Sequence, residues 1–243
     1  MRAIRVHPEA DRVLLISRTG KGKTTFARFI AEQLQPCRLI VVDPKDELDF
    51  GVQKLRTPAE LALGMHQPIV HYVPASFDRD SLEEASQIIW LTPGPYILWL
   101  DELSELSNPN WCPSGFRLAE TQGRQGRKLV IACTQRLAES HPVFRSQASH
   151  VIALVPCPVE KDLKMLAGDA IPREPEEIRA ELESLHAHHG DFSHLWYVED
   201  GDELRRCQPI PLPNGPRVPP GEGTGPQRPP ATALEEPAAE SAP

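Results

Sequence analysis

The sequence has few cysteines, no long apolar run and no excess of basic residues, and each absence excludes a class of protein. Its five cysteines are scattered, odd in number and without C-x-x-C spacing. This pattern argues against a disulfide framework or a zinc ribbon and fits a reducing compartment. No segment offers the roughly 18 consecutive apolar residues that a membrane span requires. The charged first eleven residues lack the apolar core of a signal peptide, so we expect a soluble, cytoplasmic protein without membrane contact.

The net charge is −8, from 34 acidic and 26 basic residues in a chain of 243. This charge excludes a polybasic coat that would bind nucleic acid over the whole surface. A few well-placed lysine and arginine side chains could still bind phosphate groups, because a local patch matters more than the total charge. The length suffices for one sizeable folded domain and an appendage.

The appendage is recognisable by its proline content. Eleven of the 26 prolines fall within residues 209–243, together with four glycines and no aromatic residue. Such a composition is typical of a disordered or polyproline-II-like tail, because it offers little to bury. The tail either docks onto a partner or is a solvated extension without a specific role, and the composition favours the second. We therefore expect a folded domain at 1–208 and a disordered tail at 209–243.

Short apolar segments alternate with segments of helical periodicity in the folded part. Strands are expected at 13–16, 38–42, 69–73, 96–100, 129–133 and 151–155. Helices are expected at 23–34, 81–91, 116–123, 159–166 and 175–186, and a closing hairpin at 194–198 and 203–207. The second helix has Ser81 as its expected N-cap and Glu84 as the capping-box partner. Uniformly apolar strands between helices predict an α/β fold with a mainly parallel sheet.

A glycine-containing loop joins the first strand to the first helix. It matches the pattern G-x-x-x-x-G-K-S/T except at the first position, where Ser17 replaces glycine. Gly20 and Gly22 allow backbone N–H groups to turn toward an anion, and the following helix adds its positive end. Lys23 is expected to reach the β- and γ-phosphates of ATP, and the Thr24 hydroxyl to bind Mg²⁺. The residues expected to bind the nucleotide are Ser17, Arg18, Thr19, Gly20, Lys21, Gly22, Lys23, Thr24 and Thr25.

Two adjacent acids follow the apolar strand at 96–100. Asp101 is expected to bind Mg²⁺ opposite Thr24. Glu102 is in a position to polarise an attacking water molecule as a general base. Because a kinase must shield its γ-phosphate from water, this second carboxylate favours hydrolysis over phosphoryl transfer.

Polar residues flank the next strand at both ends. Gln135 follows it and could sense the γ-phosphate or hold the water molecule, whereas Arg124 and Arg127 precede it. An arginine on an exposed loop can reach the phosphate of a neighbouring subunit. Taken alone, these signals are weak, and ordinary surface arginines are the simpler interpretation.

Four segments in order resemble the HerA/FtsK superfamily of P-loop DNA-translocating ATPases, over about residues 12–156. The loop R-T-G-K-G-K-T at 18–24 is similar to the family's R-T-G-S-G-K-T, and L-D-E at 100–102 resembles its V-D-E. The segment D-P-K at 43–45 with E-L at 47–48 resembles the D-P-K and E-L of FtsK-type motors. The strand L-V-I-A-C-T-Q-R at 129–136 is close to the family's L-V-L-A-T-Q-R. The second pair of segments is the more specific.

This resemblance implies a RecA-like P-loop NTPase fold and roles for matching residues. The catalytic set is then Lys23, Glu102, the sensor Gln135 and the trans-acting Arg124, with Arg127 ranked second. The family works as a ring, usually a hexamer, through whose pore double-stranded DNA passes. The candidate pore segments are 104–114, with an exposed Trp111, and 74–79.

The small size and the lack of a winged-helix module indicate a minimal motor with a tail. A viral or phage genome-packaging ATPase fits best, acting in the host cytoplasm or at the virion vertex, with a possible capsid or portal partner. The alternatives are a conjugation or plasmid DNA-transfer motor, a small-molecule P-loop kinase, and a nucleotide-dependent assembly factor that does not hydrolyse ATP.

Overall fold

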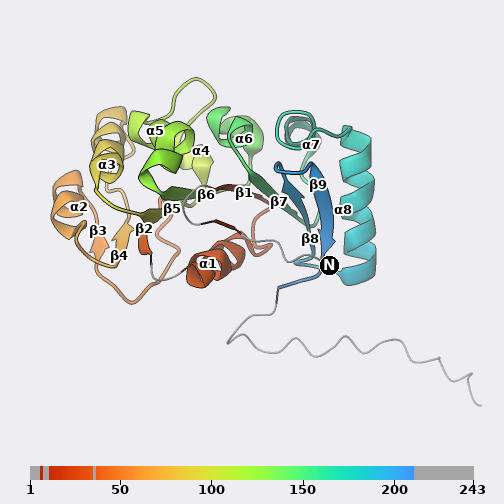
Figure 1. Cartoon of the computed structure of the whole chain (residues 1–243), viewed down its shortest axis with the longest axis horizontal. Coiled ribbons are helices and arrows are strands. Elements are labelled where there is room, and N and C mark those ends of the chain that lie inside the picture. Colours follow the sequence, from red (N-terminus) through yellow and green to blue (C-terminus); the bar gives the residue numbers. More distant parts are fainter. Residues whose placement is uncertain (1–5, 8–10, 35–36, 211–243) are drawn as a thin grey trace, which may run out of the picture. The chain divides into compact units, whose positions relative to one another are not determined.

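The computed structural model describes residues 6–7, 11–34 and 37–210. Within these residues, one sheet has the strand order β3-β4-β2-β5-β6-β1-β7-β8-β9 (Figure 1). Neighbouring strands are parallel from β3 to β7, and β8 and β9 close the sheet as an antiparallel hairpin. The strands are β1 Arg12–Ile16, β2 Arg38–Val42, β3 Lys54–Leu55, β4 Ile69–Tyr72, β5 Tyr96–Leu100, β6 Lys128–Thr134, β7 His150–Leu154, β8 His194–Val198 and β9 Glu203–Cys207.

Helices cover both faces of the sheet. The helices are α1 Lys23–Gln33, α2 Pro58–Gly64, α3 Arg79–Leu91, α4 Leu103–Leu106, α5 Ser114–Gln122, α6 Val143–Ser146, α7 Glu160–Leu166 and α8 Pro175–His189, with 3-10 turns η1 Gly123–Gly126 and η2 Leu137–Glu139. Helix α1 packs on one face, whereas α3 to α6 lie on the other (Figure 1). The mainly parallel α/β fold and the closing hairpin are therefore confirmed.

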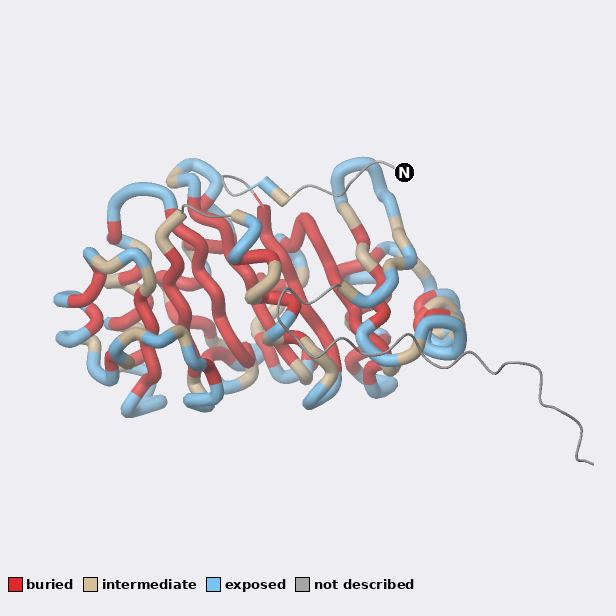
Figure 2. The backbone as a smooth tube through the Cα atoms, turned by 90° about the horizontal axis from the view of Figure 1, so that it is seen from below, coloured by how far each residue is buried: buried red, intermediate tan, exposed pale blue. Residues whose placement is uncertain are grey.

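The core consists of two layers, one on each face of the sheet. Along β1, Val13 and Leu15 join the layer under α1, and Leu14 and Ile16 join the opposite layer. Alternate side chains of a strand point to opposite faces, so a strand buried on both faces must be apolar throughout. All five residues of β1 are buried, as are those of β5 and β7 (Figure 2).

The expected start of α3 is wrong by two residues. The helix begins at Arg79, and its N-cap is Asp78, whose side chain accepts a hydrogen bond from the backbone N–H of Ser81 at 2.9 Å. Asp78 takes this role because its carboxylate sits directly before the first turn, where a negative charge also meets the positive end of the helix. The hydroxyl of Ser81 instead donates to Asp78, and Glu84 is not a capping partner.

Several short elements, among them α2, have no counterpart in the helices and strands expected from the sequence. Thr57 and Glu60 form a capping box at its start, and Pro58 occupies the first turn. The signal T-P-x-E was present in the sequence. The predicted Pro-rich tail lies outside the described residues, apart from Pro209 and Ile210. None of the described helices is long and apolar enough to cross a membrane.

Candidate nucleotide-binding site

The loop after β1 turns toward α1 through two glycines in the left-handed conformation. Gly20 has a φ of +71° and Gly22, the N-cap of α1, has a φ of +87°, and glycine tolerates these angles because it has no Cβ. Ser17 precedes them; it is buried, and its N–H donates to the carbonyl of Thr134 at 3.3 Å. Its φ is not positive. Serine therefore fits the position that the motif gives to glycine.

The Lys23 side chain is buried beside this loop. Its ammonium donates to the carbonyl of Ser17 at 3.4 Å. Burial lowers the pKa of Lys23, while the carboxylates of Glu102 and Asp101 act in the opposite direction. A buried ammonium is stabilised by an anion, and the N-terminus of α1 adds positive potential at the same point. The loop is thus built to bind an anion such as a phosphate group.

Asp101 directly follows β5 and is almost fully buried. Its carboxylate accepts a hydrogen bond from the indole N–H of Trp99 at 3.3 Å. Burial raises the pKa of Asp101 to about 6, and the nearby Asp43 adds to the increase. Thr24 lines the same pocket. A hydroxyl and a carboxylate oxygen are ligands that Mg²⁺ takes, and a cation between them would stabilise the ionised carboxylate, so these two side chains fit the expected metal.

Glu102 is held by three donors. Its Oε1 accepts from the backbone N–H of Gln135 and from the hydroxyl of Ser104, both at 3.0 Å, and its Oε2 faces the Lys45 ammonium at 3.3 Å. The backbone of Glu102 has a φ of +58°, which is uncommon for a residue with a side chain and often occurs at functional sites. These contacts fix the carboxylate at the carboxyl end of the sheet, beside the phosphate loop.

Asp43 explains why Lys45 stands at this position. Its buried carboxylate accepts from the backbone N–H groups of Leu48 at 2.8 Å and Glu47 at 3.3 Å, and it contacts His71 Nε2 at 3.2 Å. Burial alone would raise the pKa of Asp43, but the hydrogen bonds from His71 and the two amides outweigh it, so the pKa lies below its ordinary value. Asp43 therefore closes the turn after β2 that carries Lys45 to Glu102.

Gln135 connects Glu102 to the phosphate loop. Its backbone N–H donates to Glu102, and its side-chain oxygen accepts from the Thr19 hydroxyl. The position of Gln135 follows from the strand order, because β5 and β6 are parallel neighbours and their carboxyl ends lie side by side. A sensor of the γ-phosphate would need this position, between the loop and the carboxylate.

These side chains line one pocket of about 300 Å³. The lining residues are Thr19, Gly20, Lys21, Gly22, Lys23, Thr24, Thr25, Lys45, Glu47, Asp101, Glu102, Gln135 and Phe192. Most residues expected to bind nucleotide or metal are among them, and Ser17, Arg18 and Arg124 are not. Three lining residues had no expected role: Lys45, Glu47 and Phe192. The first two lie in the D-P-K and E-L segments, which could have suggested them.

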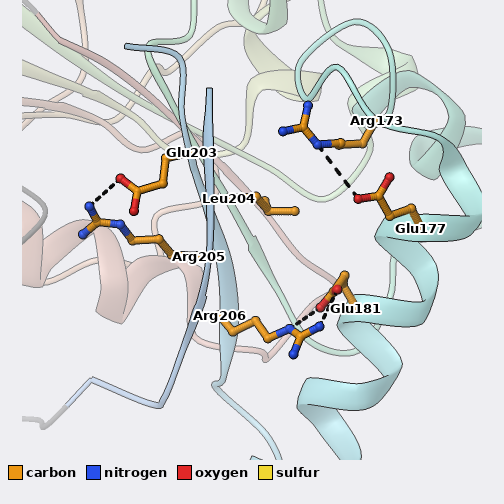
Figure 3. A pocket seen from close by; sticks show the side chains of 7 residues that line it. All are labelled: Arg173, Glu177, Glu181, Glu203, Leu204, Arg205 and Arg206. Carbon is orange, nitrogen blue, oxygen red and sulfur yellow. Dashed lines mark hydrogen bonds and ion pairs between the residues drawn. The ribbon is translucent and has the colours of Figure 1, made fainter. Parts of the chain in front are cut away.

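A larger cavity of about 860 Å³ lies between α8 and β9 (Figure 3). Its charged side chains pair with one another: Arg173 contacts Glu177 at 3.9 Å, Arg206 contacts Glu181, and Arg205 contacts Glu203 at 2.5 Å. Since these charges are already neutralised, the cavity offers no comparable site for a phosphate group. Charged side chains on an edge strand also discourage pairing with another sheet.

Comparison with known proteins gives solved structures only. No protein-family model and no curated protein matches the sequence. The genome packaging NTPase B204 from Sulfolobus turreted icosahedral virus 2, in complex with AMP, has a TM-score of 0.69 and 17% identity, covering 85% of this chain and 100% of that chain. VirB4 of Thermoanaerobacter pseudethanolicus has a TM-score of 0.60 and 12% identity, covering 86% and 92%. The chain has a P-loop ATPase fold. The fold implied by the HerA/FtsK resemblance is thereby confirmed.

Within this P-loop ATPase fold, Arg124 lies far from the pocket of its own chain. It belongs to η1, which precedes β6, whereas Gln135 follows β6. The seven residues of β6 separate the two by roughly 20 Å at about 3.3 Å per residue. Arg124 is exposed, so it could contact a nucleotide only on another copy of the chain. Arg127 lies at the same edge, with a φ of +54°.

The two expected pore segments lie side by side. The guanidinium of Arg79 is 5.3 Å from the centre of the Trp111 ring. The expectation that Trp111 is exposed is wrong: its side chain is half-buried against the core, and its backbone pairs with Asn108. Arg79 is exposed, and it is the one basic residue within these two segments.

Proposed function

We propose that this protein is an ATP-hydrolysing motor that moves double-stranded DNA, and that it packages a viral or phage genome as a homo-oligomeric ring, a hexamer as is usual in the family that it resembles. The observation that carries the proposal is the pocket that unites the buried Lys23, Asp101 and Glu102 with the half-buried Gln135. Two structural neighbours, a genome packaging NTPase and a DNA-packaging ATPase, support the packaging role.

Nucleotide binding follows from the anion site at the phosphate loop. The backbone N–H groups around Gly20 and Gly22, the Lys23 ammonium and the positive end of α1 hold the β- and γ-phosphates of ATP. Thr24 and Asp101 would hold Mg²⁺, which neutralises part of the phosphate charge when it is bound. The γ-phosphate then lies toward Glu102, because β5 and β6 end on that side of β1.

Hydrolysis requires that Glu102 accepts a proton from the attacking water. In this structure Lys45, Ser104 and Gln135 occupy its oxygens, so a water molecule must displace at least one of these donors to reach the carboxylate. Arrival of a γ-phosphate gives the Lys45 ammonium a second anionic partner, which would weaken its contact with Glu102. The Arg124 of an adjacent copy then neutralises charge that develops in the transition state. Activity is therefore coupled to assembly.

DNA contact must be local in an acidic chain with a net charge of −8. We assign it to segments 74–79 and 104–114, where Arg79 is the basic group next to Trp111. A ring needs only a few such donors per subunit, because backbone contacts repeat around the pore. A conjugation or plasmid DNA-transfer motor would use the same site and is the alternative to genome packaging.

The test is ATP hydrolysis with and without long double-stranded DNA. We expect DNA to raise turnover several-fold. Glu102→Gln should lower kcat by about 10²- to 10⁴-fold, because it removes the general base. Arg124→Ala should lower it by about 10³-fold or more, because it removes a transition-state contact. Glu84→Gln at an exposed position of α3 and Arg179→Ala at a half-buried position of α8 are substitutions of the same types away from the pocket, and they should leave turnover unchanged.

Three other results would contradict this assignment. Hydrolysis that ignores DNA but needs Glu102 would contradict translocation. Phosphoryl transfer to a small molecule would indicate a kinase, and nucleotide-dependent assembly that survives Glu102→Gln would indicate an assembly factor.

A further inference from the structure

The loop between α8 and β8, residues 190–193, lies against the phosphate loop. The Asp191 carboxylate contacts the Lys21 ammonium at 2.9 Å. The Phe192 ring packs so closely on Gly22 that a Cβ at that glycine would lie 2.8 Å from Phe192 Cδ1. This loop lies outside the residues that carry the family resemblance, and it is 170 residues from Lys21 along the chain. Only the tertiary fold brings it to the pocket.

The loop is anchored on both sides of Phe192. The buried Ser193 accepts a hydrogen bond at its carbonyl from the N–H of Val155 at 3.1 Å, and its hydroxyl donates to the carbonyl of Gly190 at 2.8 Å. The N–H of Gly190 in turn donates to the carbonyl of His186 at 2.9 Å. Because hydrogen bonds hold the loop at Gly190 and at Ser193, the fold restricts the backbone position of Phe192 between them.

Phe192 itself has two unusual properties. Its φ is +70°, which is an outlier for a bulky residue. Its side chain is 44% exposed although most large apolar side chains of the described residues are buried. A strained backbone that exposes an aromatic ring at the edge of a binding pocket is typical of a functional position rather than of core packing.

The order of the strands gives this ring a place relative to the phosphates. Asp101, Glu102 and Gln135 follow β5 and β6, on one side of β1. Phe192 precedes β8, which starts at His194 opposite Leu154, on the other side of β1 beyond β7. A nucleotide whose γ-phosphate faces the acids therefore directs its ribose and base toward the side where Phe192 lies.

We propose that Phe192 is the platform on which the base of the bound nucleotide stacks. This inference rests on the proposed function, because it requires a nucleoside triphosphate in the pocket. Stacking uses the π-face that every base has and is tolerant of base identity. We therefore also expect the protein to discriminate only weakly between ATP and GTP.

The experiment compares binding of ATP with binding of inorganic tripolyphosphate, which has the phosphates but no base. Both are titrated with Mg²⁺ into wild type and into Phe192→Ala, Phe192→Tyr and Leu63→Ala by calorimetry. Phe192→Ala should weaken ATP binding roughly 5- to 100-fold, the range of base–aromatic stacking, and leave tripolyphosphate binding unchanged. Phe192→Tyr should bind ATP nearly as wild type does. Leu63 is exposed on α2, so Leu63→Ala controls for loss of an exposed apolar side chain.

The outcomes separate the two proposals. Equal loss of ATP and tripolyphosphate binding in Phe192→Ala would show that the ring only supports the phosphate loop, and unchanged ATP binding would show that it does not contact the base; either result overturns the stacking proposal. Failure of wild type to bind both ligands would instead overturn the proposed function. Thermal unfolding of each variant identifies any loss that arises from misfolding.

Discussion

Asp101 combines burial, an elevated pKa and an expected metal contact at one residue. Its folded-state pKa of about 6 lies above the ordinary value of 3.8. Between these two values the folded state binds more protons than the unfolded state, so the free energy of unfolding falls as the pH rises through about 4 to 6 and stays lower above that range. The ionised carboxylate is thus held at a cost to stability, which is typical of residues kept for function.

We predict that Asp101→Asn stabilises the protein at neutral pH while abolishing ATP hydrolysis. The amide can keep the contact with Trp99 but carries no buried charge. A difference of about two pKa units corresponds to about 3 kcal/mol at most. The gain should shrink as the pH falls from about 6 toward 4, because the folded-state carboxyl becomes protonated over this range. Urea unfolding from pH 4 to 8 without nucleotide or Mg²⁺ measures it.

The control for this prediction is Asp200→Asn, which alters an exposed carboxylate in the turn before β9 and should change stability little at any pH. A variant at position 101 that is no more stable than wild type at pH 7 would contradict the view that burial of this charge destabilises the fold.

At the scale of elements, the contact between α3 and α5 depends on a single glycine. A Cβ on Gly115 would lie 2.0 Å from the carbonyl oxygen of Ser86, which belongs to the backbone of α3. The backbone N–H of Gly115 also donates a hydrogen bond to the Ser86 hydroxyl at 3.1 Å, which links α5 to α3 at this point. Helix α5 leads through η1 into β6, so this contact also sets the positions of Arg124 and Gln135.

We predict that Gly115→Ala destabilises the protein by roughly 1–3 kcal/mol or more, because two backbones must separate to admit the methyl group. The matched substitution is Gly64→Ala, where the added Cβ would meet the end of the Leu55 side chain at 2.4 Å. That side chain can change rotamer, and alanine favours the helix by up to about 1 kcal/mol. Chemical denaturation should show a clearly larger decrease in the free energy of unfolding for Gly115→Ala than for Gly64→Ala. Equal decreases would contradict the distinction between a clash with backbone and a clash with a side chain.

At the scale of the whole molecule, the two halves of the proposed catalytic site lie at opposite ends of the parallel strands. Glu102 and Lys23 lie at the carboxyl ends of the parallel strands, whereas Arg124 lies before β6, at the amino ends. A chain by itself therefore cannot bring Arg124 to its own nucleotide. A ring in which one copy presents the amino ends of its strands, with Arg124, to the pocket of the next copy would complete every site.

We predict that two inactive variants restore activity when mixed. A Glu102→Gln subunit still supplies Arg124, and an Arg124→Ala subunit still supplies Lys23 and Glu102, so their interface contains one complete site. Mixing equal amounts and allowing exchange should raise DNA-stimulated ATP hydrolysis at least several-fold above either variant alone. The control mixture of Lys23→Ala with Glu102→Gln should stay inactive, since both substitutions damage the pocket side of the interface. No recovery in the first mixture would contradict a shared site with Arg124.

Much of the pocket could be predicted because its residues lie in short segments. Gly20, Gly22 and Lys23 are fixed by their spacing, and strand ends in a parallel sheet meet at one edge, which brings Asp101 and Gln135 to the same pocket. The half-buried state of Trp111 could not be predicted, because it depends on how the turn at 108–111 packs on the core.

The sequence by itself determined the α/β class, the anion-binding loop and the acid pair, because local backbone geometry and apolar patterning decide these features. Only the tertiary structure decided that Lys45 meets Glu102 across 57 residues, that Phe192 lies on Gly22, and that Arg124 stands away from the pocket of its own chain. The physical reason is that such contacts depend on strand order and loop closure. These are set by packing of the whole sheet and leave no periodic signal in the sequence.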